Sequence, residues 1–163
     1  MFKHILIPLD GSLLAKKALD VATRMLDSSC EITLVTAVED SEILNYPGSP
    51  MSLNPEYYPT LEALESNGKR YLEEVADSLR KQGYRVNVVV EVGDAADCVI
   101  HTAFKREVEA IVMSTHGRSG VSRLLFGSVT GRVLRRATCP VLVVPSQETQ
   151  HKQEQKLAEM NFG

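Results

Sequence analysis

The sequence lacks any apolar run long enough to cross a membrane. Its longest apolar stretches, such as VNVVVEV and VLVV, fall far short of the roughly 18 residues that a membrane-spanning helix needs. The opening MFKHILIPLD has neither the longer apolar region nor the small-residue cleavage site of a signal peptide. We therefore expect a cytoplasmic protein without a membrane span.

Positive charge is not in excess either. Lys and Arg together number 18 against 21 Asp and Glu, so the formal net charge is -3. This balance excludes a broad cationic surface for a nucleic-acid backbone and leaves only a local basic patch possible. We expect no nucleic-acid partner.

Cysteine is scarce and unpaired in the sequence. Cys30, Cys98 and Cys139 are odd in number, widely separated and without C-x-x-C spacing. This pattern argues against a disulfide framework and against a zinc site. We expect thiols in or near the core.

The sequence does contain a regular alternation of strand and helix patterns. Its 163 residues, 44% of them hydrophobic, suit one compact domain. Runs of valine, isoleucine and leucine predict strands over 2–9, 31–38, 84–92, 109–114 and 139–145. Apolar residues at helical spacing predict helices over 13–26 and 60–82, one after an N-cap at Asp94, and one over 129–137. Ser12 is the expected N-cap of the first helix, and Gly83 the expected C-cap glycine of the second.

Strands that alternate with helices of this length are normally parallel and joined by right-handed crossovers. Strands rich in Val, Ile and Leu throughout are typical of a sheet buried on both faces. The predicted fold is therefore a single doubly wound α/β domain, a Rossmann-like open parallel sheet of five strands with helices on both faces. Ligands of such sheets bind outside the carboxyl ends of the strands, where the strand order reverses.

The stretch MSTHGRSGVSRLLFGSV, residues 113–129, follows the fourth strand and leads into the last helix. Gly117 follows the strand closely, and Gly127 with Ser128 opens the helix after nine intervening residues. Glycines allow backbone N–H groups to approach a phosphate, and a helix N-terminus adds donors and a positive dipole. The alternative is that Gly117 and Gly120 only form a turn and Ser128 only caps the helix.

Two common phosphate loops are absent from the sequence. It has no G-x-x-x-x-G-K-[ST] and no lysine between Arg106 and Val144, which excludes a Walker-type NTPase. The first strand leads into PLDGS and not into G-x-G-x-x-G. Asp10, at the end of that strand, either contacts a ligand or metal or caps the following helix.

The sequence of residues 2–145 resembles that of the universal stress protein family. The resemblance lies in ILIPLDGS, in VEVGDAADCVI and above all in IVMSTHGRSGVSRLLFGSVTGRVLRRATCPVLVVP. The nucleotide-binding branch of that family has G-x-x-G, nine residues, and then G-[ST]. This chain matches with one departure, because Ser114 stands where the first glycine is usual. Its side chain either crowds the ligand or donates a hydrogen bond to it.

The resemblance implies the strand order 3-2-1-4-5 of the adenine nucleotide alpha hydrolase-like fold. It also implies ATP, or AMP or ADP, as the ligand, with a divalent cation such as Mg or Mn. The base and ribose would contact Pro8, Leu9, Asp10 and the main chain of Ala37. The remaining implied site residues, most of them around the phosphates, are Met113, Ser114, His116, Gly117, Arg118, Gly127, Ser128 and Val129.

The function that the resemblance implies is that of a nucleotide-responsive regulator in the stress response, with a regulatory protein partner that the sequence does not identify. No carboxylate in the loop is placed to activate a water, so at most slow ATP hydrolysis is expected. At position 116, a contact between the main chain and the ligand is favoured over acid–base catalysis by the His116 side chain. The alternatives are a family member that binds no nucleotide and acts through protein contacts, and a slow ATPase.

Residues 1–146 are predicted to form the domain and 147–163 a polar tail. The proline-containing segment 39–59 is either a lid or a disordered excursion. The last strand is expected at a sheet edge, where Val141 to Val144 would pair with the same residues of a second chain in a homodimer. The alternative is a monomer in which the tail covers that edge.

Overall fold

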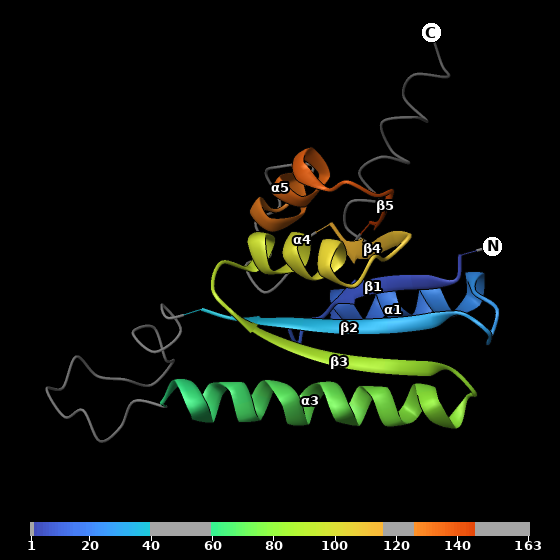
Figure 1. Ribbon diagram of the computed structural model, residues 1–163, viewed down its shortest axis with the longest axis horizontal. Coiled ribbons are helices and arrows are strands. Elements are labelled where there is room, and N and C mark those ends of the chain that lie inside the picture. The colour runs from blue at the N-terminus through green and yellow to red at the C-terminus, as the bar shows by residue number, and fades with distance from the viewer. Residues whose placement is uncertain (1, 40–59, 116–125, 146–163) are drawn as a thin grey trace, which may run out of the picture.

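The computed structural model of the protein describes residues 2–39, 60–115 and 126–145. Strands and helices alternate along these residues, as the sequence predicts (Figure 1). The strands are β1 His4–Pro8, β2 Glu31–Val38, β3 Arg85–Val92, β4 Ala110–Ser114 and β5 Val141–Val144. The helices are α1 Leu13–Met25, α3 Leu61–Lys81, α4 Ala95–Lys105 and α5 Ser128–Arg136.

The five strands form one parallel sheet in the order β3-β2-β1-β4-β5. This confirms the predicted order 3-2-1-4-5. The chain builds from β1 outward to β3 on one side and then crosses back to place β4 and β5 on the other. The order therefore reverses between β1 and β4, and a ligand crevice is expected there.

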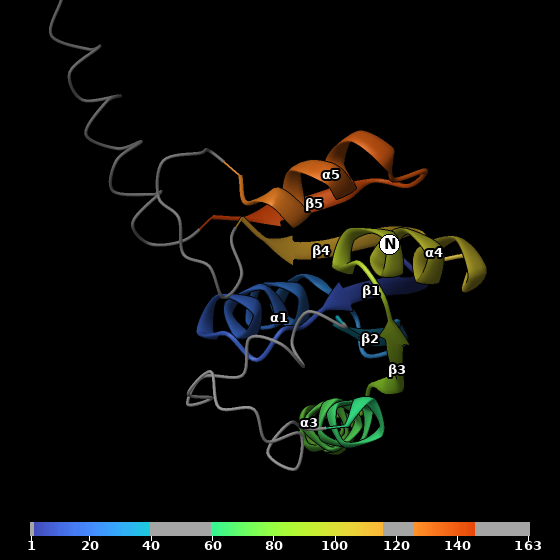
Figure 2. The same cartoon turned by 90° about the vertical axis from the view of Figure 1, so that its left-hand side faces the viewer.

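Helices cover both faces of the sheet, with α1 and α3 on one side and α4 and α5 on the other (Figure 2). Successive residues of the central strand alternate between the two cores, because side chains of a strand point to opposite faces. Ile5 and Ile7 pack with α1 and α3, whereas Leu6 packs with α4 and α5. All three are fully buried, as the valine- and isoleucine-rich sequence predicts.

Side-chain caps begin three of the described helices. Ser12 Oγ accepts from Ala15 N at 3.1 Å at the start of α1, and Thr60 Oγ1 accepts from Ala63 N at 3.1 Å at the start of α3. The Asp94 carboxylate accepts from the backbone N–H groups of Ala96 and Asp97 at the start of α4. The predicted caps Ser12 and Asp94 are confirmed. Gly83, with φ +96°, follows the end of α3 in the left-handed conformation that favours glycine.

All three cysteines are free thiols, as predicted. Cys30 and Cys98 are buried and Cys139 is half-buried. Burial raises the pKa of each thiol, because the thiolate is poorly solvated there. None of the helices in the described ranges is long and apolar enough to span a membrane. The segment 40–59 and the tail from 146 lie outside the described residues, so the predictions made for them stay predictions.

Candidate functional site

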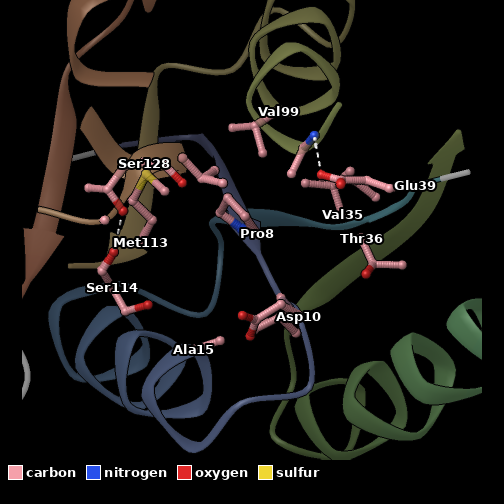
Figure 3. A pocket seen from close by; sticks show the side chains of 16 residues that line it. Pro8, Asp10, Ala15, Val35, Thr36, Glu39, Val99, Met113, Ser114 and Ser128 are labelled. Atoms are coloured by element: carbon pink, nitrogen blue, oxygen red, sulfur yellow. Dashed lines mark hydrogen bonds between the residues drawn. The ribbon is translucent and has the colours of Figure 1, made fainter. Parts of the chain in front are cut away.

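A cavity of about 340 Å³ opens at the carboxyl ends of β1, β2 and β4, at the point where the strand order reverses (Figure 3). The N-terminal turns of α4 and α5 and one residue of α1 complete its walls. The lining residues are Pro8, Leu9, Asp10, Ala15, Val35, Thr36, Ala37, Glu39, Ala95, Val99, Met113, Ser114, Gly127, Ser128, Val129 and Thr130.

The site residues named from the sequence converge on this cavity wherever the structure describes them. Those that line it are Pro8, Leu9, Asp10, Ala37, Met113, Ser114, Gly127, Ser128 and Val129. His116, Gly117 and Arg118 lie outside the described residues. Parallel strands end at one edge of the sheet, and this brings PLD and MS together from sequence positions about a hundred residues apart.

The turn after β1 holds the Asp10 carboxylate at the cavity. Asp10 Oδ1 accepts from Ser12 N at 2.9 Å, and Gly11 between them has φ +83°. The N-cap of α1 is Ser12, so the alternative in which Asp10 itself caps the helix is wrong. The carboxylate of Asp10 is instead fixed by the turn and lines the cavity.

The N-terminus of α5 opens on the cavity without a side-chain cap. Its N-cap residue is Gly127, which forms no side-chain capping hydrogen bond. Ser128 is the first helical residue, so the alternative in which it serves as the cap is wrong. Gly127 N donates to Thr115 O at 2.7 Å, which holds the helix start beside the end of β4. This terminus therefore presents its positive dipole to the cavity.

The N-terminus of α4 also borders the cavity, but carboxylates of the protein already occupy it. Asp94 accepts from two N–H groups of the first turn, and Glu39 Oε1 accepts from Ala95 N at 3.3 Å. The two helix termini at the cavity thus differ in charge, because only α4 carries acidic side chains there. An anionic group of a ligand is favoured at α5 and disfavoured at α4.

Two arginines of α5 bind acidic residues of α4 and join the helices that flank the cavity. Arg132 Nη1 lies 2.6 Å from Asp94 Oδ2, and Arg136 forms an ion pair with Asp97. The hydrogen bond from Arg132 lowers the pKa of the Asp94 carboxyl, and the helix N–H groups lower it further. The same hydrogen bond raises the pKa of the Arg132 guanidinium.

Seven lining residues were not named from the sequence: Ala15, Val35, Thr36, Glu39, Ala95, Val99 and Thr130. Strand periodicity gives a signal for Val35, which lies two positions before Ala37 and shares its face. Glu39 has only the weaker signal that it directly follows the carboxyl end of a strand. The residues from α1 and α4 carry no such signal, because their place at the cavity depends on how each helix packs on the sheet.

Comparison with known proteins decides the family. The sequence profile of the Universal stress protein family matches residues 1–145. The chain belongs to the universal stress protein family. Universal stress protein MJ0531 of Methanocaldococcus jannaschii is 30% identical over 148 residues, which cover 88% of this chain and 82% of that protein. Universal stress protein YxiE of Bacillus subtilis is 25% identical over 147 residues, which cover 88% of this chain and 99% of that one.

Solved structures of other universal stress proteins share the fold. Protein MJ0577 of Methanocaldococcus jannaschii matches with a TM-score of 0.77 and 28% identity, over 90% of this chain and 98% of that one. A universal stress protein solved in complex with cAMP matches with a TM-score of 0.62 over 88% of this chain and 97% of that one. Its identity is 20%, so this likeness shows the fold alone.

Proposed function

We propose that this universal stress protein binds an adenine nucleotide, with ATP favoured over AMP and ADP, and acts as a nucleotide-responsive regulator in the stress response. The observation that carries the proposal is the start of α5, where a glycine N-cap leaves the helix dipole facing a cavity at the switch point of the sheet. A regulatory protein partner and a cytoplasmic location remain predictions.

The cavity fits an adenine nucleotide in size and chemistry. Its volume of about 340 Å³ lies within the range of small-molecule sites, about 300–1,000 Å³. Pro8, Val35 and Val99 supply apolar walls for a planar base (Figure 3). At the opposite end, Ser114, Gly127, Ser128 and Val129 would hold the phosphates. A universal stress protein of the same fold binds cAMP, an adenine nucleotide, which is consistent with the assignment.

A divalent cation would enter with the nucleotide. No cluster of three or more His, Cys, Asp or Glu side chains suitable for a metal occurs in the described ranges. Mg²⁺ does not require such a cluster, because it usually keeps several waters and binds phosphate oxygens with one or two carboxylates. Of the two carboxylates in the described lining, Asp10 and Glu39, Asp10 is drawn toward the Ser114 side of the cavity and would serve (Figure 3). Mn²⁺ would bind the same oxygen ligands.

The site is better suited to binding than to rapid hydrolysis. The carboxylates of the described lining are Asp10 and Glu39, and each accepts a hydrogen bond from a backbone N–H. A general base must reach the attacking water, whereas these hydrogen bonds hold both carboxylates against the backbone. We therefore expect slow turnover at most. If the protein is instead a slow ATPase, the rate of product release should be proportional to the protein concentration. Substitution of Asp10 should abolish that release.

We also propose a homodimer through β5. Among the strands that the structure describes, β5 pairs only with β4 and lies at an edge. Ile111 N donates to Pro140 O and Thr115 N to Val144 O, so even-numbered residues of β5 face β4. The N–H and C=O groups of Val141 and Val143 consequently point outward, where an antiparallel copy of the strand would pair with them.

Mass spectrometry of ligand released from freshly purified protein, combined with calorimetric titration of ATP, tests nucleotide binding. Gly127→Val would place a branched side chain where phosphate oxygens lie, and should abolish ATP binding in a folded protein. Gly131→Ala is the matched control: it lies in the same helix outside the cavity lining and should bind ATP normally. Protein that is empty and does not bind ATP would favour the alternative of a family member acting through protein contacts. Unchanged affinity in Gly127→Val would show that this glycine does not contact the phosphates.

A further inference from the structure

We propose that Glu39 determines the base specificity of this site by accepting a hydrogen bond from the 6-amino group of adenine. The inference rests on the proposed function and assigns a role to a residue that the site motif does not include. Glu39 follows β2 directly, and its side chain lines the cavity.

The strand register brings the Glu39 carboxylate to the cavity beyond Ala37. Val35 packs toward α4, and Ala37 lies on the same face of β2, because alternate residues of a strand share a face. Glu39 comes directly after the strand and reaches the start of α4. The Ala37 side chain is a single methyl group, so the cavity extends past it. Glu39 Oε1 is fixed there by the N–H of Ala95, the first residue of α4.

The charge distribution sets the direction in which a nucleotide binds. Glu39 and Asp94 both occupy the start of α4 and would repel phosphates, whereas the start of α5 has a glycine N-cap. Figure 3 shows Asp10 between the Ser114 side of the cavity and the Glu39 side. A nucleotide with its phosphates at α5 would place its ribose near Asp10 and its base toward Glu39. This is the order in which the three parts are covalently joined.

The group that Glu39 meets must therefore be a donor on the base. An ionised carboxylate has about four acceptor positions and no donor. Adenine presents one exocyclic donor, its 6-amino group, whereas the ring nitrogens of its remaining edges only accept. A hydrogen bond from a neutral donor to a charged acceptor is stronger than one between neutral groups. A nucleotide that lacks the 6-amino group should consequently bind more weakly than ATP to the unmodified protein. It should bind as tightly as ATP to a variant that lacks a side-chain acceptor at position 39.

Calorimetric titration with ATP and with purine riboside 5′-triphosphate, which lacks the 6-amino group, tests the assignment. The unmodified protein should bind ATP about ten-fold more tightly. Glu39→Ala should bind the two nucleotides equally. Glu39→Gln keeps a carbonyl oxygen as acceptor and should restore part of the preference. Glu91→Ala is the matched control, since Glu91 lies on the neighbouring strand in register with Ala37, pairs with His101, and is not part of the cavity lining.

The outcomes separate the two proposals. Comparison of two nucleotides within one variant cancels any shift of α4 that affects both equally. Equal binding by the unmodified protein, or an ATP preference that persists in Glu39→Ala, would overturn the role of Glu39 and leave nucleotide binding standing. Absence of binding for both nucleotides in the unmodified protein would overturn the proposed function and the role of Glu39 with it. If Glu39→Ala does not fold, a reduced ATP preference in Glu39→Gln together with an unchanged preference in Glu91→Ala supports the assignment. An undiminished preference in Glu39→Gln, or loss of affinity for both nucleotides alike, overturns it.

Discussion

Thr130 donates its hydroxyl to the backbone carbonyl of Ser114 at 2.9 Å, and both residues are buried. The bond joins the first turn of α5 to the last residue of β4, the two described ends of the segment that carries the site motif. A buried carbonyl without a partner is costly, so this hydrogen bond holds the helix start at a fixed place beside the strand end. Thr130 is thus a positioning residue for the proposed phosphate end.

Thr130→Val should lower the free energy of unfolding by about 1 kcal/mol, since it removes a buried hydrogen bond at nearly constant volume. ATP affinity should fall as well, because the start of α5 loses its anchor. Urea denaturation and calorimetric titration measure the two effects. Thr130→Ser retains the hydroxyl and should restore ATP affinity. A Thr130→Val protein with normal ATP affinity would show that the anchor does not position the site.

Ser114 lines the cavity at the position where the family motif has glycine. If its hydroxyl donates to a phosphate, Ser114→Gly should weaken ATP binding by about 0.5–1.5 kcal/mol. If its side chain instead crowds the ligand, the same change should strengthen binding. We expect weaker binding, measured by calorimetry. An affinity equal to that of the unmodified protein would mean that the side chain of residue 114 does not face the nucleotide.

Asp94 should make stability depend on pH in the acid range. Its pKa in the folded protein lies below the ordinary value of 3.8 because of Arg132 and the helix N–H groups. The unfolded chain therefore binds the proton first as the pH falls. The stabilisation is fully present above this ordinary value and is lost as the pH falls through the folded pKa.

Two substitutions separate the cap from the charge of Asp94. Asp94→Ala removes the N-cap of α4 and should cost about 1 kcal/mol at neutral pH. Asp94→Asn retains the cap oxygen and loses the charge, so its deficit relative to the unmodified protein should shrink as the pH falls below 3.8. Urea denaturation between pH 7 and 3 measures both. A deficit of Asp94→Asn that does not change with pH would contradict the role of the ion pair with Arg132.

Val143→Pro should convert the proposed dimer into a folded monomer. Proline removes one backbone N–H, and that of Val143 points away from β4, so the internal ladder stays intact. Light scattering at tens of micromolar, with circular dichroism as the check of folding, measures the mass. Leu142→Pro would remove a donor to β4 and should disrupt the sheet itself. A monomeric mass for the unmodified protein, or a dimer that persists in folded Val143→Pro, would place the assembly elsewhere.

The fold could be predicted because its signals are local. Each strand is a short run of Val, Ile and Leu, and Ser12 and Asp94 supply the caps of helices whose apolar residues recur at helical spacing. Nine cavity-lining residues could also be named, because the family motif and the rule that ligands bind at the carboxyl ends of parallel strands identify positions next to strand ends.

The sequence by itself determined the order of elements, the buried character of the sheet and the strand ends that line the cavity. Tertiary structure alone decided that Glu39 joins Asp94 in closing the start of α4 to an anion, because that depends on a contact between the end of β2 and the start of α4. Glu39 and Ala95 are 56 positions apart, and no local pattern records their hydrogen bond. The bond between Thr130 and Ser114 likewise exists only because α5 packs beside β4. Local periodicity specifies which face of an element is buried, whereas the partner that each polar group meets is fixed only when the helices dock on the sheet.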